Sequence, residues 1–342
     1  MSDWKIYRGD GVPHDGIGDL PAPPNWRDFR GEPVMPPIAT QADGDAVRRL
    51  GTGRRPPDPA TVQMINAALY LRRPLLVTGK PGVGKSSLAY DVAQELQLGR
   101  VLSWPISSRS TLADGLYAYD PVGRLREESI RNRTAKPTAN SAKDDDTLIG
   151  KFLTLGPLGT ALLPFERPRV LLIDEIDKSD IDLPNDLLNV FEDGEYVIPE
   201  LRRVAARTSE VEVLTADDRV YAQVQEGRVR CRAFPFIVMT SNDEREFPPA
   251  FLRRCLRLNL NEPQSDQIAA MVESHLGPET ATAAREMIDA FATRRTTAGV
   301  YATDQILSAV YLRFSRADAD GDAAMIAAVD AVLNDLNNPA QP

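Results

Sequence analysis

The sequence has few cysteines and histidines, with two of each among its 342 residues. Cys231 and Cys255 lack the spacing of a metal site or a disulfide framework, and they suit a reducing compartment. His14 and His275 lie far apart with no cysteine partner, which argues against a zinc site or a histidine-centred catalytic triad. No apolar run is long enough to cross a membrane, and the N-terminus "MSDWKIYRGD" lacks the apolar core of a signal peptide. We therefore expect a cytoplasmic protein without membrane contact.

The chain also lacks an excess of positive charge, because its formal net charge is −9 at pH 7. This balance argues against broad, sequence-independent binding to nucleic acid, although a local basic patch is compatible with an acidic total. The length is sufficient for a full buried core, and it suggests two domains or one domain with a lid.

The first 58 residues are rich in proline and glycine and show no sustained periodicity, so we expect an extended N-terminal arm over residues 1–58. Aromatic residues recur in this arm at Trp4, Tyr7, Trp26 and Phe29. Aromatic side chains at intervals hold a proline-rich segment across a surface, which could belong to this subunit or to its neighbour. We therefore expect a docked arm rather than a disordered one.

A glycine-rich stretch, "GKPGVGKSS", follows the apolar run "PLLVT" and precedes "LAYDVAQEL", which has helical spacing. Three glycines in six residues allow a strand to turn sharply into a helix. A lysine at the positive end of a helix is unfavourable unless an anion binds there. The stretch matches G-x-x-x-x-G-K-[ST], in which backbone N–H groups cradle phosphates, Lys85 binds the β- and γ-phosphates and Ser86 binds Mg²⁺. The predicted phosphate-binding residues are Gly79, Lys80, Pro81, Gly82, Val83, Gly84, Lys85, Ser86 and Ser87. The alternative is a glycine-rich turn.

Hydrophobic patterning predicts an α/β fold. Helices are expected over residues 58–71 and 183–192, and strands over 75–77, 100–106, 169–174, 235–242 and 255–260. The order of strand, helix and strand is typical of a parallel sheet covered by helices.

Three further segments have distinct patterns. Residues 124–148 are charged and irregular, which predicts an insertion with a mobile tip near 140–146. Alternation in "VEVLTADDRVYAQVQEGRVRCRAF" predicts a hairpin with its turn near residues 226–227. Beyond Pro263 the signals are helical and rich in alanine, which predicts a small α-helical domain extending to about Leu336.

A second motif, "VLLIDEID", is an apolar strand that ends in paired carboxylates. A buried strand that ends in two acids indicates a cation or a reaction at that end. We expect Asp174 to hold Mg²⁺ through its water shell and Glu175 to polarise the water that attacks a γ-phosphate. The alternative is an acidic first turn of a helix.

Two more polar positions extend this set. Asn242 ends the strand "PFIVMTSN", at the carboxyl edge where ligands bind in open α/β sheets, and is a candidate for orienting the attacking water. As the alternative, an asparagine at a strand end simply forms a turn. Arg253 and Arg254 in "FPPAFLRRCLRL" have no acid near them in the sequence. They are either a solvated pair or an arginine finger that reaches a neighbouring subunit, worth about 10³ or more in rate.

In this order, the phosphate loop, Asp174-Glu175, Asn242 and Arg253-Arg254 resemble an AAA+ ATPase. "IGKFLTLGPLGTALLP", "LLNVFEDGEYVIPE" and "FPPAFLRRCLRL" resemble the MoxR-type members. The resemblance covers roughly Pro59 to Leu336. It implies a P-loop NTPase core with a five-stranded parallel sheet and a helical lid. The implied divisions are a core over 59–262, a helix-two insert at about 112–158, a pre-sensor hairpin at about 210–233 and a lid over 263–338.

The resemblance also implies ATP and Mg²⁺ as ligands and assembly into a ring, with a hexamer expected. Arg254 best matches the finger, which usually directly precedes the last strand, and Arg253 is the alternative.

MoxR-type members act as chaperones that insert metals or remodel proteins, often beside a gene for a von Willebrand-type domain protein, and some such ATPases belong to bacterial conflict systems. We therefore expect a protein client or effector, such as a von Willebrand-type domain protein, with nucleic acid the less favoured partner.

One position departs from the AAA+ pattern. Many lids carry a second-sensor arginine, whereas "YATDQILSAVYLRF" offers Asp304, and an acid there would repel the γ-phosphate. Either Arg294 or Arg295 substitutes, or the lid responds less to ATP than in relatives.

Three alternative functions remain. The first is a nucleotide-operated switch that recruits or releases an effector, motivated by the arm and by Asp304. The second is a nucleic-acid motor, which the basic residues of the insert and hairpin suggest and the surrounding acids disfavour. The third is a small-molecule kinase, which needs neither a finger from a neighbour nor a helical lid.

Overall fold

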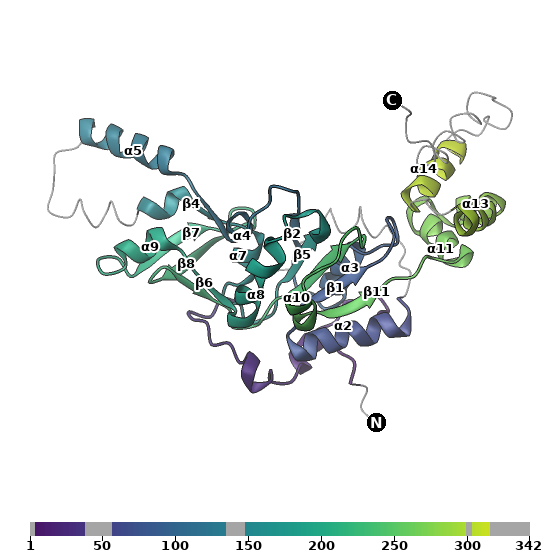
Figure 1. The fold of residues 1–342 in the computed structure, drawn as a ribbon, viewed down its shortest axis with the longest axis horizontal. Helices are drawn as coiled ribbons and strands as arrows, with labels where there is room; N and C mark the ends of the chain where they lie inside the picture. The colour runs from purple at the N-terminus through teal and green to yellow at the C-terminus, as the bar shows by residue number, and fades with distance from the viewer. Residues whose placement is uncertain (1–3, 38–56, 135–147, 299–302, 315–342) are drawn as a thin grey trace.

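The computed structural model describes residues 4–37, 57–134, 148–298 and 303–314. Figure 1 shows a central sheet flanked by helices, a second sheet at one end of the molecule and a group of helices at the other.

The central sheet has five strands in the order β11-β1-β10-β5-β2, and every neighbouring pair is parallel. The strands are β1 (Leu75–Thr78), β2 (Leu102–Pro105), β5 (Val170–Asp174), β10 (Phe236–Ser241) and β11 (Leu256–Asn259). This confirms the five-stranded parallel sheet predicted from the sequence. Because the strands are parallel, their carboxyl ends meet at one edge, where Thr78 lies beside Ser241 and Pro105 beside Asp174.

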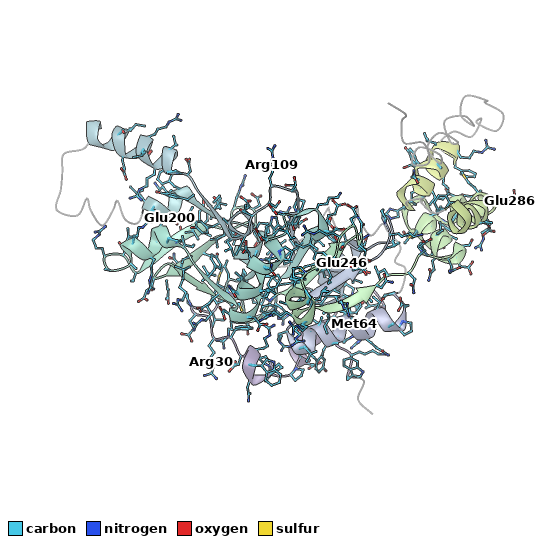
Figure 2. All side chains as sticks on the ribbon, in the orientation of Figure 1. Arg30, Met64, Arg109, Glu200, Glu246 and Glu286 are labelled. Atoms are coloured by element: carbon cyan, nitrogen blue, oxygen red, sulfur yellow. The ribbon has the colours of Figure 1, made fainter. Side chains whose placement is uncertain are left out.

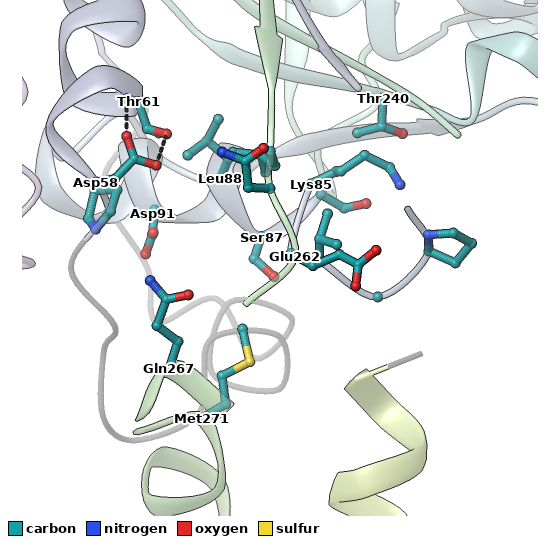
Figure 3. Close-up of a pocket in the computed structure, with 18 of the residues that line it drawn as sticks. Asp58, Thr61, Lys85, Ser87, Leu88, Asp91, Thr240, Glu262, Gln267 and Met271 are labelled. Atoms are coloured by element: carbon teal, nitrogen blue, oxygen red, sulfur yellow. Dashed lines mark hydrogen bonds between the residues drawn. The ribbon is translucent and has the colours of Figure 1, made fainter. Parts of the chain in front are cut away.

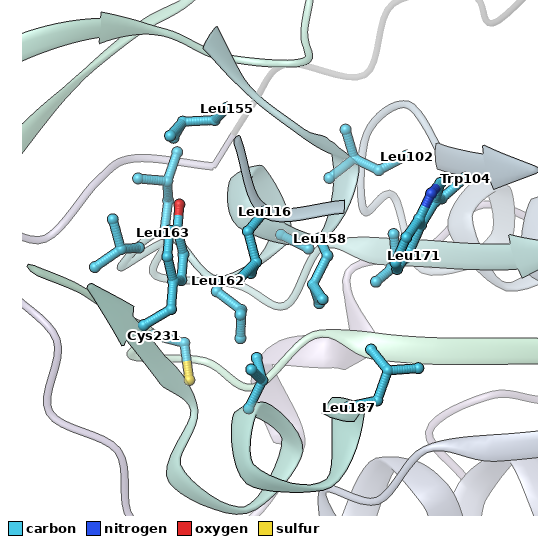
Figure 4. Close-up of a cluster of buried hydrophobic side chains, with 14 of the residues drawn as sticks. Leu102, Trp104, Leu116, Leu155, Leu158, Leu162, Leu163, Leu171, Leu187 and Cys231 are labelled. Atoms are coloured by element: carbon cyan, nitrogen blue, oxygen red, sulfur yellow. The ribbon is translucent and has the colours of Figure 1, made fainter. Parts of the chain in front are cut away.

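Both faces of this sheet are buried at its three central strands β1, β10 and β5, which explains their nearly continuous apolar sequences. Along β5, Leu171 and Ile173 join one hydrophobic cluster, while Val170 and Leu172 join a second cluster on the opposite face. Helices α2 (Pro59–Leu71), α3 (Ser87–Glu95) and α8 (Leu183–Asp193) contribute to these clusters. Figure 4 shows part of the first cluster, in which Trp104, Leu171 and Leu187 come from a strand, its neighbour and a helix.

Helix α2 begins and ends as its sequence predicts. Asp58 caps its N-terminus by accepting a hydrogen bond from the backbone N–H of Thr61 at 2.9 Å, and Pro59 occupies the first turn, where no N–H donor is needed. Arg72 ends the helix in a left-handed conformation with φ 51°.

A second sheet has six strands in the order β3-β4-β7-β8-β9-β6. The strands are β3 (Tyr117–Tyr119), β4 (Leu153–Leu155), β6 (Glu195–Val197), β7 (Glu210–Leu214), β8 (Tyr221–Gln225) and β9 (Arg228–Arg230). The predicted turn lies between β8 and β9 at Glu226 and Gly227, which have φ of 49° and 66°. The joining of the insert and of β6 to this hairpin was not predicted from the sequence, because three-residue strands are too short to show alternation.

Helix α5 (Pro121–Thr134) corrects the prediction for the insert, because residues 124–134 are helical rather than irregular. The helix includes an ion pair one turn apart, with Arg124 Nε and Glu128 Oε1 3.0 Å from each other. The predicted tip near 140–146 lies outside the described residues. Shorter helices near the two sheets are α4 (Leu112–Leu116), α7 (Pro157–Ala161), α9 (Pro199–Val204) and α10 (Pro249–Arg254).

The C-terminal part is helical, as the sequence predicted, and it has a core of its own. Its helices are α11 (Ser265–Leu276), α12 (Pro278–Ala283), α13 (Arg285–Ala298) and α14 (Thr303–Phe314). Ile268, Ile288 and Ile306 are fully buried in one cluster formed by α11, α13 and α14. The side chains of Asp304, Arg294 and Arg295, on which the second-sensor prediction depends, lie outside those that the structure describes.

The N-terminal arm docks along its own chain over residues 4–37, which confirms the docked arm and assigns its surface. Tyr7 is fully buried, and the backbone N–H groups of Ile6 and Tyr7 donate to Asn66 Oδ1 at 2.7 and 3.0 Å. Glu95 accepts from the backbone of Arg8, Gly9 and Gly11, which fixes the next turn of the arm. Trp26 does not anchor the arm to its own chain, because this side chain is 76% exposed.

We expect Asn66→Ala to lower the free energy of unfolding by about 3 kcal/mol, because it leaves buried backbone N–H groups of the arm without acceptors. Thermal unfolding followed by tryptophan fluorescence measures the change. Trp4 of the arm packs edge-on against Tyr70, which lies on the same helix as Asn66. Gln63→Ala, on the exposed face of α2, serves as the control. Equal stability of the two variants would contradict the anchoring role of Asn66.

Within the described ranges, no helix combines the length and the apolar character needed to cross a membrane. Cys231 and Cys255 are buried free thiols, and burial raises the pKa of each to about 12.

Candidate functional site

A cavity of about 860 Å³ lies at the carboxyl edge of the central sheet, between the glycine-rich loop and helix α11. Figure 3 shows Lys85, Ser87 and Thr240 on its sheet side, with Gln267 and Met271 of α11 opposite. The cavity thus lies between the core and the C-terminal helices, at the edge where open α/β sheets bind ligands.

The glycine-rich loop needs its glycines for the reason that the sequence suggested. Gly79, Gly82 and Gly84 have φ of 146°, 73° and 93°, values that side chains rarely tolerate. A side chain on Gly79 would also place its Cβ 2.6 Å from the carbonyl oxygen of Leu260. The loop can therefore wrap closely around a ligand with its backbone.

Lys85 lies at the centre of this loop and is only 8% exposed. Its Nζ donates to the carbonyls of Gly79 and Lys80 at 2.7 and 3.0 Å, and to Asn242 Oδ1 at 2.6 Å. Burial lowers the pKa of Lys85, while nearby carboxylates, chiefly Asp177, oppose this shift. An anion bound in the loop would offset the cost of burying this ammonium group.

Ser86 and Asp174 form a pair of oxygen ligands suitable for a hard cation. Ser86 Oγ donates to Asp174 Oδ1 at 2.7 Å, and Thr240 Oγ1 donates to the same oxygen at 2.7 Å. Hydroxyl and carboxylate oxygens are the ligands that Mg²⁺ prefers, so these residues fit the ion that the sequence predicted. Thr240 was missed, although its position two residues before Asn242 at the strand end could have indicated it.

Glu175 follows β5 in a left-handed conformation with φ 62° and ψ 49°. Its backbone N–H donates to Thr240 Oγ1 at 2.8 Å, and its Oε2 accepts from Lys178 Nζ at 2.8 Å. The Glu175 side chain is 45% exposed and lines the cavity. Hydrogen bonding to Glu175 raises the pKa of Lys178, a residue that the sequence analysis did not single out.

Asn242 is held at the same edge by the carboxylate of Asp177. The backbone N–H of Asn242 donates to Asp177 Oδ2 at 2.8 Å, and Asp177 is 5% exposed. Asp177, the third acid of "IDEID", therefore orients the strand end that carries Asn242, a role that was not predicted from the sequence.

The two candidate finger residues lie outside this cavity, near the end of α10. Arg254 Nε donates to Glu192 Oε1 of α8 at 2.7 Å, and the Arg254 side chain is 39% exposed. Arg253 Nε donates to the carbonyl of Pro249 in its own helix at 3.3 Å. The structure thus brings the loop, Asp174, Glu175 and Asn242 together and leaves Arg253 and Arg254 apart. It also gives Arg254 an acidic partner that is distant in the sequence.

The rest of the cavity is formed by the start of α2 and by α11. Asp58 and Thr61 face it from α2, and Gln267, Met271 and His275 face it from α11. Burial lowers the pKa of His275, which favours the neutral form of its imidazole. This mixed apolar and polar wall can accommodate the organic part of a ligand whose phosphates occupy the loop.

The family profile of the AAA domain (dynein-related subfamily) matches residues 74–255, more than half of the 342 residues. The chain therefore belongs to the AAA domain family, in its dynein-related subfamily. No match was found among the curated proteins. The MoxR type suggested by the sequence stays a prediction.

Two solved structures resemble the chain at low sequence identity. PCH-2 of C. elegans is 15% identical with a TM-score of 0.37, and the alignment covers 81% of this chain and 67% of PCH-2. NtrX from Brucella abortus, solved in complex with ATP, is 16% identical with a TM-score of 0.39, and the alignment covers 83% of this chain and 54% of NtrX.

Proposed function

We propose that the protein is a Mg²⁺-dependent ATPase of the AAA+ class that hydrolyses ATP between the subunits of a ring and thereby remodels or activates a protein partner. The observation that carries this proposal is the single cavity that holds the phosphate-binding loop, the Ser86–Asp174 pair, Glu175 and Asn242. Family membership of the chain supports ATP as the nucleotide.

The phosphate-binding loop, the Ser86–Asp174 pair, Glu175 and Asn242 have distinct roles in this proposal. Backbone N–H groups of residues 79–87, except that of Pro81, which has none, would hold the phosphates, and Lys85 would exchange its loop carbonyls for phosphate oxygens. Ser86 would hold Mg²⁺ directly and Asp174 would hold it through water, and the ion would neutralise charge on the β- and γ-phosphates. Glu175 would orient and polarise the attacking water, with Asn242 fixing its position. Glu175 Oε2 accepts from Lys178, and this exposed ion pair is weak enough to be exchanged for a contact with the attacking water.

The proposed ring is supported by the partly exposed position of Arg254 outside the cavity of its own chain. Within the described residues, no arginine lines the cavity, whereas charge on the transferred phosphate calls for one. Arg254, partly exposed at the end of α10, would supply this charge to the next subunit, with Arg253 as the alternative. The resemblance to MoxR-type ATPases favours a hexamer in the cytoplasm, divided into an arm over 1–58, a core over 59–262 and a lid over 263–338. It also favours a client such as a von Willebrand-type domain protein.

A nucleotide-operated switch is the second candidate, favoured by the Glu175–Lys178 ion pair. If this pair persists when ATP is bound, hydrolysis is slow, and the ATP-bound assembly would recruit an effector, as expected of a defence system. The arm would then be the effector contact. The nucleic-acid motor would require turnover that DNA stimulates and salt weakens.

ATP turnover of the purified protein, measured over a wide range of protein concentrations, tests the proposal. We expect turnover per subunit to rise steeply with concentration, because each site is completed by its neighbour. Low turnover at every concentration despite ATP binding would favour the switch. Absence of ATP binding would contradict both.

A further inference from the structure

A chain of contacts connects the N-terminal arm to the candidate finger on α10. It starts at Arg27, which ends the short helix η2 (Asn25–Arg27) of the arm and is 3% exposed. Nη1 of Arg27 donates to the carbonyl of Phe191 and, at 3.5 Å, to that of Glu192. Both carbonyls belong to the last turn of α8, where backbone acceptors lack helical partners and a cation is favoured. Arg27 therefore caps α8 from the arm.

Further contacts hold the arm at this end of α8. Phe29 stacks on Phe234 with ring centroids 5.4 Å apart, and the Phe29 ring fills the space that a side chain on Gly194, the C-cap of α8, would need. The backbone N–H of Gly31 donates to the carbonyl of Cys231 at 2.9 Å. These contacts fix the arm within four residues after Arg27, so the cap is part of a packed interface.

Glu192 continues the chain of contacts to Arg254. Its Oε1 accepts from Arg254 Nε at 2.7 Å, and Arg254 Nη1 donates to the carbonyl of Ala250 at 3.3 Å. Among the residues that the structure describes, no hydrogen bond is made by Arg254 Nη2. Burial lowers the pKa of Arg27. The negative charge of Glu192 opposes this shift and the positive charge of Arg254 adds to it, so Arg27 interacts electrostatically with both residues. The guanidinium of Arg254 is thus held along one edge with Nη2 left available.

We propose that Arg27 and Glu192 are positioning residues for the Arg254 finger: the arm holds the end of α8, and Glu192 holds Arg254 in the orientation that the neighbouring γ-phosphate requires. This inference rests on the proposed role of Arg254. Orientation matters because a misplacement of about 1 Å can cost about 10²-fold in rate. The arm lies outside residues 74–255, which match the family, and it gains a role in the ATPase by this route.

Substitution of Arg27 tests the connection. Arg27→Met keeps most of the aliphatic stem and removes the capping donors, and we expect turnover about tenfold lower with unchanged ATP affinity. Arg27→Lys keeps a cation near the helix end and should recover much of the rate. Glu192→Ala should reproduce the loss. The matched control is Arg30→Met on the same arm, because the Arg30 side chain is 81% exposed and points away from the body (Figure 2).

Mixed assemblies distinguish a finger defect from a general structural defect. Glu175→Gln subunits are expected to hydrolyse ATP at least about 10²-fold more slowly but carry an intact arm and finger, so they should complete the site of an Arg27→Met neighbour and raise its turnover. Turnover of Arg27→Met at the wild-type rate, or no rise on mixing, would overturn the inference. If the Arg254→Ala variant turns over ATP at the wild-type rate, the proposed finger is contradicted, and the positioning role of Arg27 and Glu192 is contradicted with it.

Discussion

Arg254→Ala is expected to lower ATP turnover by about 10³-fold and to leave ATP affinity unchanged, because a finger stabilises charge that develops only in the transition state. The substituted side chain lies outside the cavity of its own subunit, so nucleotide binding there has no direct dependence on it. Steady-state turnover at saturating ATP, together with titration of a fluorescent ATP analogue, measures the two effects separately.

Arg253→Ala is the matched comparison for this prediction, since Arg253 is adjacent to Arg254, is exposed and donates to a carbonyl of its own helix. We expect little change in turnover. A large loss in Arg253→Ala with normal turnover in Arg254→Ala would exchange the two roles, and normal turnover in both would contradict a finger from α10.

Glu175→Gln is expected to bind ATP normally and to lower turnover by about 10²-fold or more, because the amide cannot polarise the attacking water. The substitution keeps the shape of the side chain and an oxygen that can still accept from Lys178. Product formation in a single turnover, with bound ATP quantified in the same sample, gives both results directly.

The control for Glu175→Gln is Glu246→Gln, which changes an exposed carboxylate beyond β10 (Figure 2). It alters net charge equally and should turn over at the wild-type rate. Unchanged turnover in Glu175→Gln would remove Glu175 from the mechanism and leave the phosphate-binding loop unaffected.

Much of the central sheet and of the cavity could be predicted because the motifs lie at strand ends. Apolar runs identified the five strands, and parallel packing then brought Thr78, Asp174 and Ser241 to one edge. Contacts made across the fold were not predictable in the same way. Asp177 binds the backbone of Asn242, and Glu192 pairs with Arg254 only because α8 packs against α10.

The second sheet and α5 show where local patterns are insufficient. Strands of three residues, such as β3 and β6, carry too few positions for a period of two to be visible. In α5, charged residues such as Arg124 and Glu128 suggested a loop, but they are good helix formers and pair across one turn. Composition alone could not distinguish an exposed helix from a solvated loop.

The order of strands in the second sheet also bears on how the chain folds. Strand β4 pairs with β3 and, through Thr154 and Leu214, with β7, while β6 pairs with β9, so the sheet joins three separate stretches of the chain. During synthesis, β3 and β4 leave the ribosome before β7 exists, and β6 leaves before β9. Non-local pairings of this kind form slowly, because long loops must close first. Completion of this sheet is therefore expected to be a late step in folding, during which the unpaired strand edges are the part of the nascent chain most prone to aggregate.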